Sequence, residues 1–175
     1  MIVPRRGVTG LLLMVVVAGA ATAGEVIGNT YISEKDGVIE ISAPAWNIKD
    51  TETAGSPMLA ELTVKQPLDG MVPKVQFFRL ANPGGVIQPD FLIGQIRDGL
   101  AKQGAEVGQI EPRRVAGKRI LTTQFTVSRD GGRAHGLIYM LRGDRALYWA
   151  QFYSNVVVWE QARPLFDELM EKVKY

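Results

Sequence analysis

The order of apolar and polar residues predicts a chain built mainly of β-strands separated by turns. Short runs rich in β-branched and aromatic residues are bounded by glycine, proline and aspartate, as is typical of strands. In the second half of the chain the connections are short, which predicts a meander of antiparallel hairpins. The expected strands are Val38–Ser42, Leu59–Lys65, Val75–Leu80, Val107–Arg114, Ile120–Val127, Ala134–Leu141 and Ala146–Tyr153.

Two other segments have the apolar spacing of amphipathic helices. The first begins at Pro89, a residue that suits a first helical turn, and ends before Gly104, which suits the position just after a helix. The second is the terminal helix, and we expect Pro164 in its first turn because a proline deeper inside would kink it. Their apolar stripes are Leu92, Ile93, Ile96 and Leu100 in the first and Trp159, Ala162, Phe166, Leu169 and Val173 in the second.

The last two strands are apolar on both faces. In the segment 134–141, Leu137, Tyr139 and Leu141 alternate with Ile138 and Met140. An antiparallel sheet that is buried on both sides needs a layer above and a layer below it. The pattern therefore predicts an α+β fold, with a central antiparallel β-sheet flanked by helices on both faces, as in an α/β/α sandwich.

Residues 1–23 have the order of a secretory signal peptide. Arg5 and Arg6 precede an apolar run, and Ala21-Thr22-Ala23 has the small residues that a signal peptidase requires. The run is too short to span a membrane, so we predict Sec export and cleavage after Ala23, which releases the protein into the periplasm or the medium. The alternatives are an uncleaved anchor or a short buried helix.

The remaining residues, 24–175, form one predicted domain, because no linker divides them. Of 20 basic residues, two lie in the leader, which leaves 18 against 18 acidic ones. This balance argues against a nucleic-acid binder, which needs surplus clustered Lys and Arg. The chain has no cysteine, so it can form neither disulfides nor a lipid anchor on a cysteine. We expect no transmembrane span in the mature chain.

The order of elements resembles that of the PsbP-like superfamily over roughly residues 30 to 174. The resemblance rests on GVIEIS closed by APAW, on DFLIGQIRDGLAKQG, and on ALYWAQFY followed by VVVWEQARPLFDELMEKV. It implies the PsbP-like fold, whose members mostly act as binding or assembly factors. No residues here match those that would bind a photosystem or Ran, so only the fold is carried over.

Catalytic chemistry finds little support in the sequence. His135 is the only histidine. A hydrolytic triad would pair it with Ser128 and Asp130, but these residues flank a predicted hairpin turn and no nucleophile elbow is present. One histidine without thiolates does not make a zinc site, and no calcium-binding loop occurs. We therefore predict a protein that is not an enzyme and has no metal or cofactor, with a small hydrolase as the alternative.

Carboxylates and tryptophans allow two further hypotheses. A pair of carboxylates can cleave a glycosidic bond, but Glu40, Glu61 and Asp98 are placed as ordinary exposed charges. The tryptophans could instead line a small-molecule cleft between sheet and helix, near the first of them, although packing in the core or between sheet and helix is the favoured explanation. They are Trp46, Trp149 and Trp159.

Charge is distributed unevenly along the chain. From Glu111 to Arg145 there are eight basic residues and three acidic ones. Alternate turns of a meander lie at the same end of its sheet, so the basic residues near Ala116-Gly117 and Gly143-Asp144 should gather there. We call them the basic cluster: Arg114, Lys118, Arg119, Arg142 and Arg145. They predict binding to an acidic protein or an anionic envelope component, or else they are solvated hairpin ends. The sequence thus favours an exported, non-enzymatic binding or assembly protein of the cell envelope.

Overall fold

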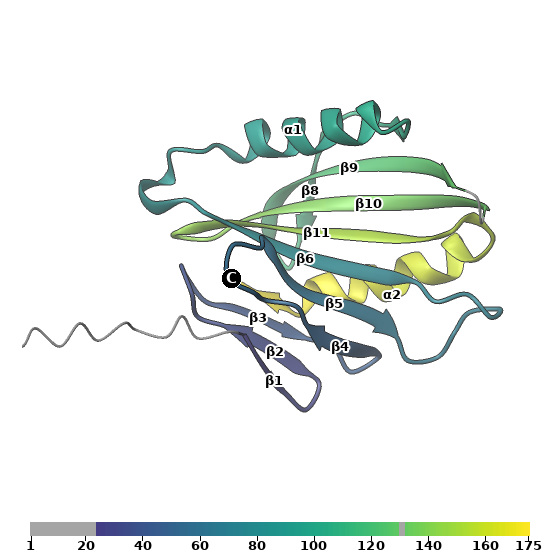
Figure 1. Ribbon diagram of the computed structural model, residues 1–175, viewed down its shortest axis with the longest axis horizontal. Coiled ribbons are helices and arrows are strands. Elements are labelled where there is room, and N and C mark those ends of the chain that lie inside the picture. The colour runs from purple at the N-terminus through teal and green to yellow at the C-terminus, as the bar shows by residue number, and fades with distance from the viewer. Residues whose placement is uncertain (1–23, 130–131) are drawn as a thin grey trace, which may run out of the picture.

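The computed structural model describes residues 24–129 and 132–175, and Figure 1 shows its elements. The predicted leader, its cleavage site and Asp130 lie outside the described residues. No helix in the described part of the chain is both long enough and apolar enough to cross a membrane.

The larger sheet has eight antiparallel strands and contains the predicted meander. Its order is β4-β5-β6-β11-β10-β9-β7, and β8 also pairs with β9. Five expected strands are confirmed within a few residues, as β5, β6, β9, β10 and β11. The strands are β4 (Trp46–Asp50), β5 (Met58–Val64), β6 (Lys74–Ala81), β7 (Glu106–Val107), β8 (Glu111–Val115), β9 (Lys118–Arg129), β10 (Gly132–Arg142) and β11 (Ala146–Asn155).

A second sheet of four strands, in the order β1-β2-β3-β12, was not predicted. The expected strand 38–42 is β3, but it belongs to this smaller sheet. The expected continuous strand 107–114 is wrong, because the structure has two separate strands there, β7 and β8, with a break that begins at Gly108. The four strands are β1 (Glu25–Ile27), β2 (Thr30–Ser33), β3 (Ile39–Ser42) and β12 (Val173–Lys174).

Two α-helices and two short 3-10 helices, η1 (Pro83–Gly85) and η2 (Val156–Val158), complete the fold. The first α-helix is confirmed: α1 (Pro89–Lys102) begins at its proline, and Gly104 has a φ of +86°. The terminal helix α2 (Trp159–Glu171) begins earlier than expected, so Pro164 lies inside it and not in its first turn. The hydrogen bond lost there would have used the carbonyl of Glu160, an exposed residue whose carbonyl can bond to water instead.

Two apolar clusters lie on opposite faces of the larger sheet, because alternate residues of β10 belong to different clusters. Ile138 and Met140 pack with Ile93 of α1. Leu137, Tyr139 and Leu141 pack with α2 and with β2 and β3. The α+β class and the antiparallel sheet are thus confirmed. The α/β/α sandwich is not confirmed in that simple form, because the smaller sheet shares the second cluster with α2.

A buried polar group ties the two sheets together. Arg79 of β6 donates a hydrogen bond to Glu52 at 2.7 Å, and the two side chains are 6% and 4% exposed. Tyr31 and Ser33 of β2 donate to the other carboxylate oxygen of Glu52 at 2.9 and 3.0 Å. Burial alone would raise the pKa of Glu52, but the hydrogen bonds from Arg79, Tyr31 and Ser33 outweigh it and hold the pKa below its usual range.

Candidate functional site: the basic cluster and a groove beside helix α1

Two tight turns place the basic cluster at one end of the larger sheet. Ala116 and Gly117 join β8 to β9, and both have positive φ angles, +47° and +78°. Gly143 donates a backbone hydrogen bond to Ala146 at 3.0 Å across the turn from β10 to β11. Because β9 and β10 are antiparallel neighbours, these two turns lie at the same end of the sheet.

Within the β8–β9 hairpin, two arginines are directly opposite each other. Arg114 pairs in register with Arg119, so the two side chains leave the same face of the hairpin. Lys118 lies on the other face, where its ammonium donates to the backbone oxygen of Tyr175 at 3.0 Å and sits 3.7 Å from the centre of that ring. One lysine of the cluster is therefore used to hold the C-terminus.

The β10–β11 turn holds the other two arginines. The pairing of β9 with β10 ends at Leu121 and Met140, two residues short of Arg119 and Arg142. No ladder pairs therefore join the two halves of the cluster. The Arg142 guanidinium approaches the η1 loop, 3.6 Å from where a side chain at Gly85 would begin. The cluster is thus a pair of basic groups at one sheet end, not a single row.

Pairing separates the arginines of this cluster from Arg113 and Arg133. Its four arginines are exposed, and none forms an ion pair within the described part of the chain. By contrast, Arg113 binds Asp167 at 3.0 Å and Arg133 binds Glu106 at 2.8 Å. The fold therefore leaves the charges of the cluster available to a partner, with Asp144 of the second turn as a local counter-charge.

Of the hypothetical triad, the structure describes His135 and Ser128, and both lie on the β9–β10 ladder opposite other residues. His135 Nδ1 lies 2.8 Å from the hydroxyl oxygen of Thr126, its cross-strand neighbour, and its ring packs edge-on against Trp159. Ser128 is opposite Arg133 in the ladder. The imidazole is thus held by a threonine and a tryptophan.

The acidic residues do not gather either. Glu40 pairs with Lys174 at 2.8 Å, Asp98 pairs with its neighbour Arg97, and Glu61 accepts a hydrogen bond from Gln76 at 3.0 Å. Within residues 24–129 and 132–175, no three His, Asp or Glu side chains are placed to hold a metal ion.

The hollow near Trp46, between the segment 42–46 and α2, has a volume of only about 10 Å³, which is too small for a small-molecule ligand. Trp46 itself is 2% exposed and lies in the core with Trp159. Trp149 alone of the three is half-buried, and it stacks on Phe78 with ring centres 4.9 Å apart. The hollow between sheet and helix lies elsewhere. It is a groove of about 530 Å³ beside the C-terminal end of α1, and we call it the α1 groove.

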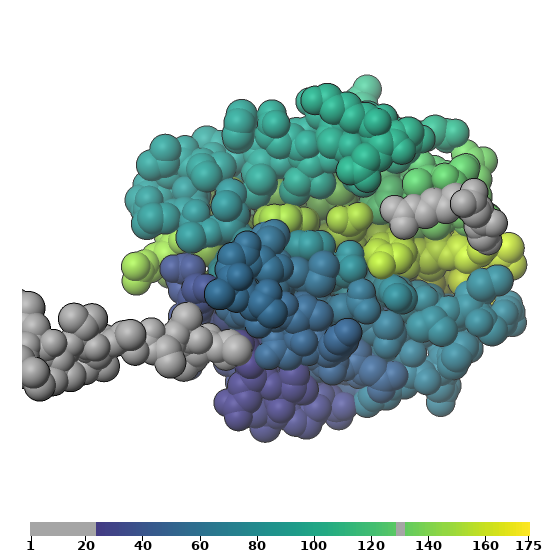
Figure 2. Space-filling view, in the orientation of Figure 1, coloured from purple at the N-terminus to yellow at the C-terminus, as the bar shows by residue number. Residues whose placement is uncertain are grey.

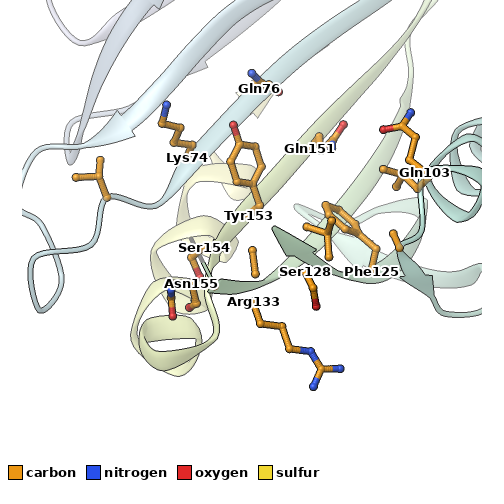
Figure 3. Close-up of a pocket in the computed structure, with 16 residues that line it drawn as sticks. Lys74, Gln76, Gln103, Phe125, Ser128, Arg133, Gln151, Tyr153, Ser154 and Asn155 are labelled. Atoms are coloured by element: carbon orange, nitrogen blue, oxygen red, sulfur yellow. Dashed lines mark hydrogen bonds between the residues drawn. The ribbon is translucent and has the colours of Figure 1, made fainter. Parts of the chain in front are cut away.

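Residues of five elements line the α1 groove: β6, α1, β9, β10 and β11, together with the segment after α1. Gln151 and Tyr153 of β11 form its floor, Lys74 and Gln76 of β6 lie on one side, and Gln103, just after α1, lies on the other (Figure 3). In the space-filling view, yellow-green atoms of the C-terminal strands are visible between the teal helix α1 and the blue segments below it (Figure 2). The groove was not predicted from the sequence, because its lining combines β6 and the end of α1 with strands much later in the chain.

Comparison with known proteins gives a fold but no family. No protein-family model matches the sequence, and no curated protein matches it. Among solved structures, cyanobacterial PsbP (CyanoP) from Synechocystis sp. PCC 6803 is similar with a TM-score of 0.59 and 18% identity, covering 96% of this chain and 97% of that one.

Two further structures show the same likeness. LpqN of Mycobacterium tuberculosis, involved in cell envelope biogenesis, has a TM-score of 0.53 and 16% identity, covering 78% of this chain and 82% of its own. A Pseudomonas aeruginosa protein described as a putative regulator has a TM-score of 0.55 and 12% identity, covering 82% and 95%. Together these likenesses show that the chain has the PsbP-like fold.

Proposed function

We propose that this chain is an exported accessory protein of the cell envelope, and that it binds an anionic partner through its basic cluster without catalysing a reaction. The observation that carries the proposal is the pair Arg114 and Arg119, exposed and opposite each other on neighbouring strands. Like charges in this position destabilise a sheet. The described fold provides no counter-ion for either residue, so an external anion accounts for them best.

The surroundings of the cluster support the same proposal. Arg142 and Arg145 add two exposed charges at the same end of the sheet. Val86, 80% exposed, follows the glycine that Arg142 approaches, so an apolar side chain stands beside the cations. A partner that combines negative charge with apolar surface would complement this end.

The similar structures support the proposed role in the envelope. LpqN is described as involved in cell envelope biogenesis. Likeness of fold alone does not transfer a function, but an accessory role in the envelope agrees with the predicted signal peptide of residues 1–23.

Co-sedimentation with the isolated cell envelope tests the proposal. The double reversal Arg119→Glu with Arg142→Glu changes one exposed arginine in each half of the cluster, and we expect it to abolish most of the sedimented fraction. The matched control is Lys49→Glu with Lys102→Glu, which changes the net charge equally at exposed residues away from the cluster. If both double variants sediment like the unmodified protein, the cluster is not the binding surface.

A further inference from the structure

The α1 groove is a second candidate site, at the opposite end of the sheet from the basic cluster. Its floor strand β11 ends there at Asn155, whereas the basic turn lies before the start of the strand at Ala146. Polar and apolar residues share its lining, and three glutamines are among the polar ones: Gln76, Gln103 and Gln151. A groove of this size with a few placed polar groups is typical of small-ligand sites.

Backbone recognition of a peptide is excluded at the floor of the groove. β6 and β11 are interior strands, each paired on both sides, so their N–H and C=O groups are already used within the sheet. A peptide that adds a strand needs a free edge. A ligand here must therefore be recognised by side chains alone.

Charge in the groove favours a neutral ligand. None of the described residues that line it is acidic, and its two cations already have counter-ions: Lys74 lies 3.9 Å from Glu61, and Arg133 lies 2.8 Å from Glu106. Figure 3 shows the Arg133 guanidinium pointing away from the other labelled side chains. The remaining polar groups are amides and hydroxyls, which donate and accept hydrogen bonds without net charge.

Aromatic rings border the amides on both sides. The register of β6 and β11 places three pairs in succession on this face: Lys74 with Tyr153, Gln76 with Gln151, and Phe78 with Trp149. Tyr153 and Trp149 are four residues apart, about 13 Å along the strand, which is longer than one sugar ring. Flat rings that flank amide groups suit the apolar faces and the hydroxyls of sugars.

We propose that the α1 groove and the adjoining Phe78–Trp149 pair bind a neutral oligosaccharide. One sugar ring packs against Tyr153 and another against Trp149, and the amides of Gln76 and Gln151 hydrogen-bond the hydroxyls between them. The hydrogen bond that Gln76 donates to Glu61 fixes its amide, so the Gln76 carbonyl oxygen is the group left to accept from the ligand.

Tryptophan fluorescence of the purified protein provides the test, because Trp149 is half-buried while Trp46 and Trp159 are 2% and 7% exposed. The probes are the trimers of N-acetylglucosamine, glucose and galacturonic acid. We expect a saturable change with at least one neutral trimer and none with the anionic galacturonate trimer. No saturable change with either neutral trimer up to about 10 mM, or binding of the anionic trimer alone, would overturn the proposal.

A pair of double variants locates the site. Gln76→Ala with Gln151→Ala should weaken binding of the neutral trimer at least tenfold, whereas Gln95→Ala with Gln161→Ala, two exposed glutamines elsewhere, should leave it unchanged. Trp149→Phe should remove the fluorescence change, and calorimetry should show weaker binding because a smaller ring then faces the sugar. Equal affinities for the two double variants would overturn the assignment of the groove. Envelope sedimentation should be unaffected by the groove variants, so this inference and the proposed function fail independently.

Discussion

The link between the two sheets makes a strong prediction about stability. Glu52→Gln removes the negative charge opposite Arg79, although the amide oxygen can still accept hydrogen bonds from Tyr31 and Ser33. Removing one partner of a buried ion pair costs about 3–5 kcal/mol. Asp36, 3.8 Å from Arg79, retains part of the compensation, so we expect a loss of about 3 kcal/mol in the free energy of unfolding.

This loss corresponds to a fall in Tm of about 6–12 °C, since each kcal/mol is worth about 2–4 °C in a chain of this size. Urea unfolding and a thermal scan of the same samples measure it. The control is Glu40→Gln, which breaks the exposed pair with Lys174 and should cost less than about 1 kcal/mol. Equal losses for the two variants would refute the reasoning that Glu52 neutralises a buried charge. The double variant Glu52→Leu with Arg79→Met should recover only part of the loss. No buried charge is then left unpaired, but the hydroxyls of Tyr31 and Ser33 lose their acceptor.

Two further predictions rest on the structure and a third on the sequence of the leader. The folded state holds the pKa of Glu52 below its usual range, so the stability that Glu52 contributes is fully present above the ordinary carboxyl pKa and is lost as the pH falls. The difference in free energy of unfolding between the unmodified protein and Glu52→Gln, measured in urea, should therefore become smaller in acid. Gly136→Ala should lower the free energy of unfolding by about 1–3 kcal/mol, because the new Cβ would overlap the Phe125 ring. Gly99→Ala lies in a helix with open space around it and should raise the free energy of unfolding by up to about 1 kcal/mol; urea unfolding measures both. N-terminal sequencing of the exported protein should begin at Gly24, and recovery of an intact Met1 would contradict the predicted cleavage.

Local patterns were sufficient to predict most of the larger sheet and α1. Leu92, Ile96 and Leu100 recur every four residues, and β10 and β11 have apolar residues on both faces. Both patterns can be recognised within a short stretch of sequence. The latter correctly required two apolar clusters, because each face of β10 contributes to a different one.

The smaller sheet could not be predicted in this way. β12 is only two residues long and continues the apolar spacing of α2. This spacing predicts that Val173 is helical, but Val173 pairs with Ile41 of β3. The position of Pro164 inside α2 was also not predicted. A proline favours the first turn of a helix, but the packing of Trp159 and Ala162 in the core stabilises an earlier turn.

The two candidate sites differ in the same respect. The basic cluster could be predicted because a meander places alternate turns together, but the sequence did not reveal that Lys118 would hold Tyr175. The α1 groove depends on contacts between β6, β11 and the end of α1, and it needed the structure.

The proposed function requires the basic cluster to bind an anionic partner in the cell envelope. The affinity of the purified protein for the isolated envelope, measured over a range of salt concentrations, tests this binding. We predict that affinity falls steeply with salt for the unmodified protein and for Lys49→Glu with Lys102→Glu, and that it is weak and nearly independent of salt for Arg119→Glu with Arg142→Glu. An unchanged affinity and salt dependence in the arginine variant would contradict the account and leave the cluster as solvated hairpin ends.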